Sequence, residues 1–260
     1  MSGPERSRHD EEIVLDTDPA QPDIDEAETD IGRVAPLPLK TFADLGVAPD
    51  IVDALAKHNI INPFPIQALA IPLAIKEHDL IGQARTGTGK TMGFTVPILH
   101  KIDRTDTEER QRPGAKPQAL VVVPTRELAT QVTRDVDMAG ANRGTRVLTV
   151  YGGRSYEPQL DALRKGVDVV VGTPGRLLDL AGQRVLDLSE LKVLVLDEAD
   201  EMLDLGFLPD VERIVALAPA KRQTMLFSAT MPGPVVALSR RYLTHPTHVR
   251  AESPDESSMV

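Results

Sequence analysis

The sequence predicts a three-layer α/β fold, in which a mainly parallel central sheet carries helices on both faces. Short runs rich in β-branched residues alternate along the chain with longer amphipathic stretches, as a parallel sheet with crossover helices requires. The short runs are mostly apolar instead of alternating between apolar and polar residues, which is typical of strands buried on both faces. The 260 residues, of which 41% are hydrophobic, are enough to bury such a core.

The predicted strands are six short runs, at residues 79–84, 119–124, 146–151, 167–172, 192–197 and 223–228. The predicted helices are the amphipathic stretches at residues 90–102, 126–139, 156–165, 175–182, 207–217 and 233–243. Before the first strand, Ile51, Ala54 and Leu55 recur at helical spacing, and three prolines punctuate residues 61–75. Residues 104–118 are polar and contain two prolines, so we expect an exposed loop there.

The net charge of −10 is concentrated near the ends of the sequence. Residues 1–34 contain 11 acidic and 3 basic side chains. Because residues 1–35 also contain few large apolar residues, we expect them to form an acidic disordered tail. The rest of the sequence is about neutral, so the acidic balance does not exclude a face that binds phosphates.

The composition also limits the compartment and the kind of site. The sequence contains no cysteine, which excludes disulfides and thiolate metal sites. It has no apolar run of about 18 residues, and its first residues lack the apolar core of an export signal. We therefore expect a cytoplasmic protein with no membrane partner.

The motif "ARTGTGKT", which begins at Ala84, follows a predicted strand and opens a predicted helix. Gly87 and Gly89 let backbone amides turn toward a phosphate, and the helix N-terminus adds its dipole. Lys90 can reach the β- and γ-phosphates of a nucleotide, and the Thr91 hydroxyl can hold Mg²⁺. Ala84 stands where the strict phosphate-loop pattern has glycine, and an ordinary glycine-rich turn is the alternative interpretation.

The stretch "VLVLDEADEML", residues 193–203, ends a predicted strand in carboxylates. A Mg²⁺-bound nucleotide needs an acidic group at the end of a neighbouring strand, and Asp197 can supply it. Glu198, one residue further, can orient and deprotonate an attacking water. The alternative role for Asp197 is that of a helix cap.

Three further strand ends carry hydroxyls, glycines or arginines where helices are predicted to start. Such groups suit a run of phosphates, and the lack of a set that could read base edges indicates recognition of a nucleic-acid backbone. Each motif alone could equally be a cap and a turn. The residues are Thr125 and Arg126 in "PTRELATQ", Gly153 in "YGGRS", and Thr173, Gly175 and Arg176 in "GTPGR".

Two other motifs carry polar groups that can complete such a site. In "FSATMP", Ser228 and Thr230 can hydrogen-bond to Asp200, or they can cap the next helix. In "NPFPIQ", the amide of Gln67 can pair with N6 and N7 of adenine, and Phe42, 25 residues upstream, can stack on the same base. The alternative for Gln67 is an ordinary surface glutamine.

Taken together, these motifs resemble the first of the two RecA-like domains of the DEAD-box RNA helicases, and in particular their bacterial members. The resemblance covers about residues 40–250 and consists of Phe42 with "PFPIQ", then "ARTGTGKT", "PTRELA", "GG", "TPGR", "DEAD" and "SAT", in the family's order. It implies a RecA-like P-loop fold and ATP-dependent unwinding or remodelling of RNA, with ATP and Mg²⁺ as cofactors.

The resemblance also implies a role for each matching residue. ATP would be bound by Phe42, Gln67, Arg85, Thr86, Gly87, Thr88, Gly89, Lys90 and Thr91, and Mg²⁺ by Thr91 and Asp197, partly through water. Catalysis would involve Lys90, Asp197 and Glu198, while Asp200, Ser228 and Thr230 would couple hydrolysis to unwinding. The RNA backbone would be bound, with little sequence specificity, by Thr125, Arg126, Gly153, Thr173, Gly175 and Arg176.

The family's second RecA-like domain carries "ARGxD" and "HRxGRxGR"-type motifs, and neither occurs in the 260 residues. We therefore expect residues 36–250 to be the first domain, with a final edge strand after Leu243, and residues 251–260 to begin a linker. The second domain of a longer chain is then an expected partner. Because it would supply an arginine finger, worth about 10³- to 10⁵-fold in rate, we expect this chain alone to be nearly inactive.

The main functional hypothesis is thus an ATPase domain of an RNA helicase. The alternative is a non-catalytic fragment that binds nucleotide and RNA backbone weakly without turnover. A different P-loop enzyme, such as a small-molecule kinase, would leave "PTRELA" and "TPGR" without a role.

Overall fold

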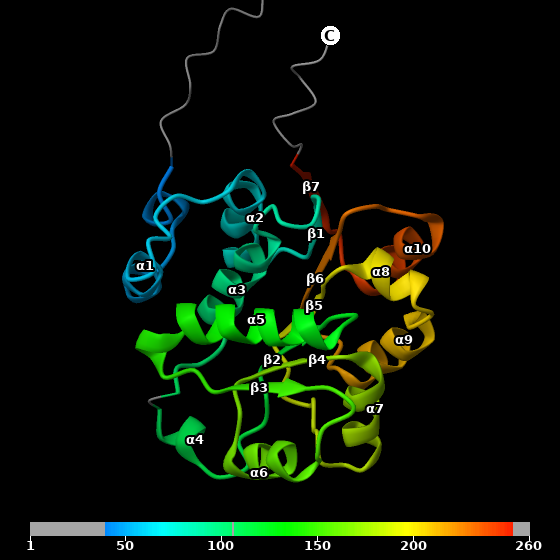
Figure 1. The fold of residues 1–260 in the computed structure, drawn as a ribbon. Helices are drawn as coiled ribbons and strands as arrows, with labels where there is room; N and C mark the ends of the chain where they lie inside the picture. The colour runs from blue at the N-terminus through cyan, green and yellow to red at the C-terminus, as the bar shows by residue number, and fades with distance from the viewer. Residues whose placement is uncertain (1–39, 106, 252–260) are drawn as a thin grey trace, which may run out of the picture. The chain divides into compact units, whose positions relative to one another are not determined.

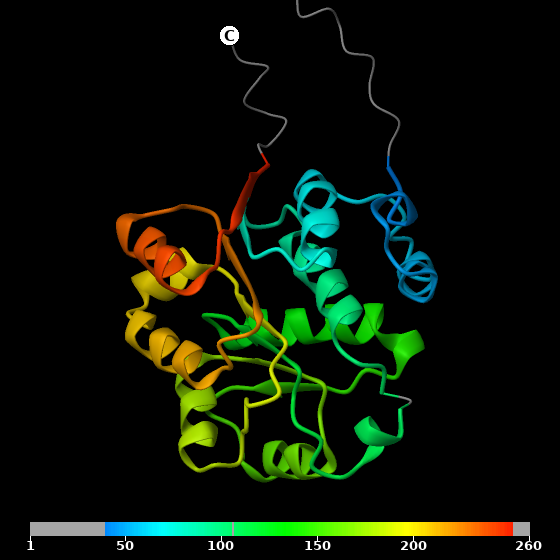
Figure 2. The ribbon, with the colours of Figure 1, turned by 180° about the vertical axis from the view of Figure 1, so that it is seen from behind.

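The computed structural model describes residues 40–105 and 107–251, and in this part of the chain seven strands form one sheet (Figures 1 and 2). The strands are β1 (Leu80–Gln83), β2 (Ala119–Val122), β3 (Val147–Val150), β4 (Val169–Gly172), β5 (Val193–Leu196), β6 (Gln223–Ser228) and β7 (Thr247–Arg250). Their order is β3-β4-β2-β5-β6-β1-β7, and every neighbouring pair is parallel. The six predicted strands and the predicted edge strand are confirmed.

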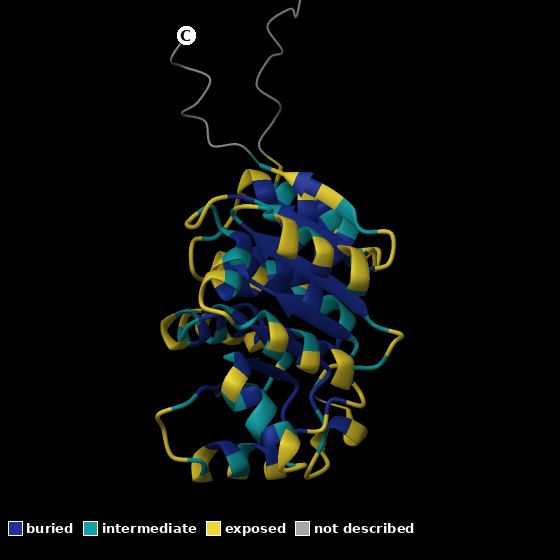
Figure 3. Cartoon of the chain, turned by 90° about the vertical axis from the view of Figure 1, so that its right-hand side faces the viewer, coloured by how far each residue is buried: buried dark blue, intermediate teal, exposed yellow. Residues whose placement is uncertain are grey.

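The described helices pack on both faces of the sheet, which confirms the three-layer arrangement. They are α1 (Pro49–Ala56), α2 (Pro65–Ile75), α3 (Lys90–Lys101), α4 (Glu108–Gln111), α5 (Arg126–Ala139), α6 (Glu157–Lys165), α7 (Pro174–Gly182), α8 (Ala199–Asp204), α9 (Leu208–Leu217) and α10 (Gly233–Tyr242). Helices α1, α2, α3 and α5 share one hydrophobic core with the sheet, and α6 to α10 share a second core on the other face. Figure 3 shows the buried strands between helices whose outer surfaces are exposed.

Strand β5 illustrates why the strand sequences are apolar throughout. Val193 and Val195 point into one core, while Leu194 and Leu196 point into the other. Successive side chains of a strand lie on opposite faces, so a strand covered on both sides needs apolar residues at every position. The apolar run therefore ends where the sheet ends.

The expectation of an exposed loop at residues 104–118 was right for most of the segment, since residues 107–109 and 111–114 are exposed, and wrong for a part of it. Helix α4 lies in this segment, and Arg110 and Gln118 are buried. The Arg110 guanidinium donates two hydrogen bonds to the Asp168 carboxylate, the shorter at 2.7 Å, and others to the carbonyl oxygens of Lys116 and Val167. A buried charge is tolerated when it is paired and hydrogen-bonded in this way, and the local polarity of the sequence did not reveal the pairing.

Asp168 is the centre of a polar network at the amino ends of β2, β3 and β4. Besides Arg110, its carboxylate accepts hydrogen bonds from the side chain and backbone of Arg146 and from the Thr105 hydroxyl. Burial alone would raise the pKa of Asp168, but these hydrogen bonds hold the pKa below its ordinary value of 3.8. The anionic form is therefore the one that the fold stabilises.

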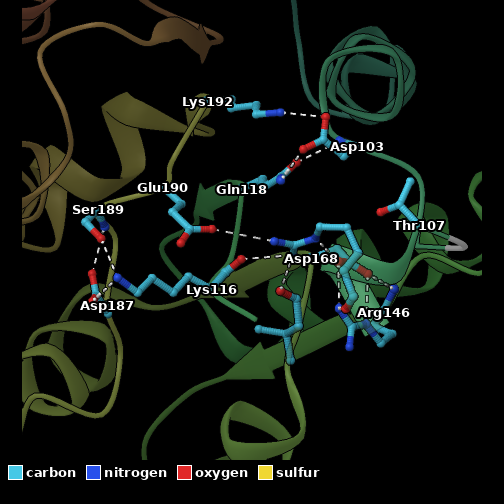
Figure 4. A network of polar contacts seen from close by, with 12 residues as sticks. Asp103, Thr107, Lys116, Gln118, Arg146, Asp168, Asp187, Ser189, Glu190 and Lys192 are labelled. Atoms are coloured by element: carbon cyan, nitrogen blue, oxygen red, sulfur yellow. Dashed lines mark hydrogen bonds and ion pairs between the residues drawn. The ribbon is translucent and has the colours of Figure 1, made fainter. Parts of the chain in front are cut away.

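The network continues across the same edge of the sheet through further ion pairs (Figure 4). Asp103 accepts hydrogen bonds from Lys192 and Gln118, both at 2.7 Å. Lys116 pairs with Asp187 at 2.9 Å. These contacts tie the connection before β2 to the residues before β5.

Some predictions concern residues that the structure does not describe. The acidic tail at residues 1–35 and nearly all of the linker at residues 251–260 lie outside the described residues, so these domain limits remain predictions. Within residues 40–105 and 107–251, no helix has the length and apolar character needed to span a membrane.

We expect Asp168→Asn to lower the free energy of unfolding by about 3 to 5 kcal/mol, because it removes the carboxylate that the buried Arg110 and the half-buried Arg146 share, and only Glu190, 3.7 Å from Arg110, remains nearby. Asp161→Asn is the matched control, since its ion pair with Arg164 is on the surface, and should change stability by less than about 1 kcal/mol. Urea denaturation at neutral pH measures both.

The stability of these two variants should also depend on pH in different ways. A folded pKa below the unfolded value gives stability that is present above about pH 4 and is lost as the pH falls through the folded pKa. Asp168→Asn should therefore flatten the loss of stability in acid. Equal denaturation curves for the two variants would contradict the role given to Asp168.

Candidate functional site

The parallel sheet brings the predicted motifs that follow strands to one end of the sheet. Because every described strand runs in the same direction, the segments that follow the strands leave the sheet on the same side. The neighbours β5, β6 and β1 bring together the glycine-rich loop, the carboxylates and the "SAT" segment. The neighbours β3, β4 and β2 bring together the three predicted phosphate-contacting motifs.

Lys90 and Glu198 form a buried ion pair at the first of these groups. The Lys90 Nζ lies 2.8 Å from the Glu198 Oε2, and the two residues are 5% and 6% exposed. The Thr86 hydroxyl donates a hydrogen bond of 3.1 Å to the other carboxylate oxygen. The glycine-rich loop thus holds the side chain that sequence reasoning assigned to water activation.

The backbone of Glu198 is strained. Its φ of 51° and ψ of 54° are left-handed, a conformation that costs a non-glycine residue about 1 to 2 kcal/mol. Such strain persists only when neighbouring interactions hold it, here the ion pair with Lys90 and the start of α8. Strained backbone of this kind is common at functional sites.

Asp197 is 2% exposed beside this ion pair. Burial raises its pKa to about 7, the nearby charge of Glu198 adds to the increase, and Lys90 opposes it. Among residues 40–105 and 107–251, the Asp197 carboxylate is in no ion pair, and it accepts a hydrogen bond of 3.0 Å from the Glu198 amide. Its oxygens, together with the Thr91 hydroxyl at the start of α3, are the donor type that Mg²⁺ prefers.

The described residues contain no group of three or more His, Cys, Asp or Glu side chains that could hold a metal ion.

The glycine-rich loop is held against the start of α2. Gly89 has a φ of 80°, and a Cβ added there would lie 2.5 Å from Gln67 Nε2 and 2.7 Å from the Phe64 ring. The Gln67 Nε2 donates a hydrogen bond of 2.7 Å to the Gly89 carbonyl, and its Oε1 accepts one of 3.0 Å from the Phe64 amide. Gln67 is therefore buried and structurally engaged, which excludes the interpretation as an ordinary surface glutamine.

The two aromatic residues near this loop differ in exposure. Phe42, which sequence reasoning assigned to base stacking, is 1% exposed and belongs to the core, so its role remains a prediction. Phe64 is 56% exposed and lies beside Gly89. Sequence reasoning missed Phe64, although an aromatic residue between two prolines next to Gln67 was a usable signal.

Asp200, Ser228 and Thr230, which were predicted to link two motifs, are connected by hydrogen bonds. Asp200 Oδ2 accepts hydrogen bonds of 2.8 Å from both the amide and the hydroxyl of Thr230. The Ser228 hydroxyl accepts a hydrogen bond of 3.2 Å from the Asp200 amide. The carboxylate segment after β5 is thereby connected to the segment after β6.

The second group of motifs surrounds a hollow of about 610 Å³. Its lining includes five of the six residues predicted to contact a nucleic-acid backbone, namely Thr125, Arg126, Thr173, Gly175 and Arg176. The sixth, Gly153, lies against Arg126, because a Cβ there would come within 2.6 Å of the guanidinium. Glycine at this position allows Arg126 to lie on the backbone of the neighbouring loop.

Two of these residues also serve the fold. Thr125 caps α5, because its hydroxyl oxygen accepts a hydrogen bond of 3.2 Å from the Leu128 amide, while the hydroxyl hydrogen remains available. The Arg176 guanidinium lies 3.9 Å from the centre of the Tyr156 ring and donates to the Arg154 carbonyl oxygen. Arg176 is thus largely engaged within the protein, whereas Arg126 is exposed.

Comparison with known proteins gives consistent relatives. A family model described as DEAD/DEAH box helicase matches residues 64–238. The DEAD-box ATP-dependent RNA helicase CshA of Streptococcus pneumoniae is 46% identical over 209 residues, which are 80% of this chain and 38% of that protein. The ATP-dependent RNA helicase DeaD of Escherichia coli is 48% identical over 215 residues, which are 82% of this chain and 33% of that protein.

A solved structure has the same fold. It is that of a DEAD box protein from the hyperthermophile Methanococcus jannaschii, with a TM-score of 0.75 and 34% identity, and the match covers 82% of this chain and 56% of that one. The chain spans between 33% and 38% of the two curated relatives named above.

We expect Gly89→Ala to lower the free energy of unfolding by about 2 kcal/mol, because alanine disfavours a φ of 80° and its Cβ would displace Gln67 or Phe64. Gly182→Ala is the matched control, since its Cβ would meet nothing within 4 Å, and it should leave stability unchanged or slightly raised. Thermal unfolding measures both variants, and equal stability would contradict the tight contact at Gly89.

Proposed function

The chain belongs to the DEAD/DEAH box helicase family, and from this premise we propose that it is the ATP-binding and hydrolysing domain of a protein that unwinds or remodels RNA. The observation that carries the proposal is the contact of Lys90 and Thr86 with Glu198, beside the buried Asp197. The names of the relatives favour this function over a fragment without turnover.

On binding, the phosphates of ATP would replace Glu198 as the charged partner of Lys90. The backbone amides from Gly87 to Lys90 would receive the phosphates at the start of α3, where the helix dipole favours negative charge. Lys90 would then pair with phosphate oxygens instead of Glu198. Once released, the Glu198 carboxylate could accept a proton from the attacking water.

Asp197 and Thr91 would hold Mg²⁺, partly through water. Asp197 would give up its proton, since a nearby cation stabilises the carboxylate that burial disfavours. Held by these two side chains, Mg²⁺ would supply positive charge that stabilises the phosphate oxygens during transfer.

Adenine recognition is proposed for Gln67. Its amide uses one hydrogen for Gly89 and one lone pair for Phe64, and so retains one hydrogen and one lone pair for a base. The exposed Phe64 ring offers an apolar surface beside this amide, and the buried Phe42 would have to be partly uncovered to stack on the base.

The RNA backbone is proposed to lie along the second group of motifs. Arg126, which lies over Gly153, is the exposed cation, Gly175 leaves room for close approach, and Thr125 and Thr173 stand at the starts of α5 and α7. The contacts of Asp200 with Ser228 and Thr230 would transmit the state of the ATP site. A second RecA-like domain of the full-length chain would complete both the ATP site and the RNA site. The isolated 260-residue chain would therefore turn over ATP slowly. The protein is proposed to act in the cytoplasm.

We expect Glu198→Gln to keep or strengthen ATP binding, because it removes the carboxylate that competes for Lys90, and to slow ATP turnover by about 100-fold or more, because the amide cannot accept the proton. Turnover is measured in the full-length protein and binding with a fluorescent ATP analogue.

Glu201→Gln is the control for this variant, since Glu201 is an exposed carboxylate on α8. It should retain both binding and turnover. Undiminished turnover in Glu198→Gln would remove Glu198 as the base.

A further inference from the structure

A second hollow, of about 700 Å³, adjoins the proposed RNA site and shares Arg126 and Glu127 with it. A third hollow, of about 500 Å³, shares Thr130, Tyr151 and Arg154 with the second. The three hollows therefore form a continuous band from the start of α7, along α5, to the edge strand β3.

We propose that single-stranded RNA flanking the core site follows this band, with phosphates near Arg134 and Arg154 and a base stacked on the Arg154 guanidinium. This inference rests on the proposed function, because it extends the RNA-binding face beyond the residues that the family motifs supply.

The charge of the band fits a nucleic-acid backbone. Arg126, Thr130 and Arg134 are four residues apart on α5, so they lie on one side of the helix, about 6 Å apart along its axis. Arg134 and Arg154 are exposed, and among the described residues neither side chain has an ion pair with a carboxylate. Glu127 is the one acidic residue that lines the second hollow. A row of exposed guanidinium and hydroxyl groups is suited to successive phosphates.

Arg154 is also arranged as a stacking surface. Its guanidinium carbon lies 5.3 Å from the centre of the Tyr151 ring, so the ring supports one side of the guanidinium. The Arg154 carbonyl is held by Arg176 at 3.2 Å, which fixes the loop that carries it. Unpaired bases stack on arginine planes as well as on aromatic rings, and such stacking does not depend on sequence.

An unsatisfied polar atom lies at the far end of the band. Gln159 lines the third hollow and is buried. Its Nε2 donates to the Ser155 carbonyl, while its Oε1 has no hydrogen-bond partner among the residues that the structure describes. A buried acceptor of this kind is normally paired. Because this oxygen is shielded from solvent, a ribose 2′-hydroxyl or a base amino group could pair with it only if the Gln159 side chain turned toward the hollow.

The test compares two RNA lengths. Fluorescence anisotropy measures binding of the 260-residue chain to labelled oligouridylates of about 6 and about 12 nucleotides at several salt concentrations. The Arg134→Ala/Arg154→Ala variant should bind the longer RNA about tenfold more weakly and the shorter one within about twofold of the unaltered chain. For the longer RNA, the slope of the logarithm of the binding constant against the logarithm of the salt concentration should become shallower by about 1.4 in this variant. This corresponds to about 0.7 for each lost phosphate contact.

Two further variants separate the contributions. Arg154→Lys keeps the positive charge but removes the planar guanidinium group on which a base could stack. This variant should therefore show the same salt dependence as the unaltered chain and bind the longer RNA about fivefold more weakly. Arg240→Ala, an exposed arginine on α10 outside the band, should bind both RNAs normally.

Each other outcome would overturn the inference. Equal losses on both RNA lengths would mean that the arginines act on the core site, and no loss would mean that RNA does not reach them. Normal affinity of Arg154→Lys would exclude base stacking on Arg154 and leave only a charge contact with phosphate, which would overturn the stacking part of the inference. If the unaltered chain bound neither RNA, both the core site and the band would be excluded as RNA-binding surfaces of this chain. If only Arg126→Ala weakened binding, and weakened it on both RNAs, the core site would be supported and the inference about the band overturned.

Discussion

The hydrogen bonding of one parallel sheet is the constraint on which the rest of the structure depends. Because β5 pairs with β6 and β6 pairs with β1, the segments after these strands leave the sheet side by side. Lys90 and Glu198 are 108 positions apart in the chain, yet their side chains are in contact for this reason. The same parallel pairing of β2 with β4 and β4 with β3 assembles the proposed RNA-binding face.

Buried carboxylates have different surroundings at the amino and carboxyl ends of the strands, which are called here the amino and carboxyl edges of the sheet. At the amino edge, Asp168 is fully matched by Arg110, Arg146 and Thr105, so its anionic form is stabilised. At the carboxyl edge, Asp197 has no ion pair within the described part of the chain, and burial raises its pKa to about 7. The paired Asp168 stabilises the fold. Asp197, which lies beside the strained backbone of Glu198, is instead placed where a cation and phosphates could bind.

The sequence was sufficient wherever a signal is local. The apolar runs located the strands, and the spacing of "TGTGKT" and "DEAD" located the carboxyl edge, because strand ends and glycine turns depend on neighbouring residues. It was insufficient where a contact joins distant segments. The polar segment around Arg110 gave no sign that Asp168, 58 residues later, would bury it, and the exposure of Phe64 and burial of Phe42 depend on packing against α2 and the core. The pairing of Arg154 with Tyr151 likewise follows from loop geometry and not from a motif.

The central claim is that Lys90 exchanges Glu198 for the phosphates of ATP, and a crystal structure of the chain with Mg²⁺ and a non-hydrolysable ATP analogue tests it most directly. We expect the Lys90 Nζ to leave Glu198, to which it is now bound at 2.8 Å, and to contact the β- and γ-phosphates, with Asp197 near the metal and Gln67 beside the base. A bound analogue whose phosphates lay away from the Gly87–Lys90 loop, with the ion pair between Lys90 and Glu198 intact, would contradict the account.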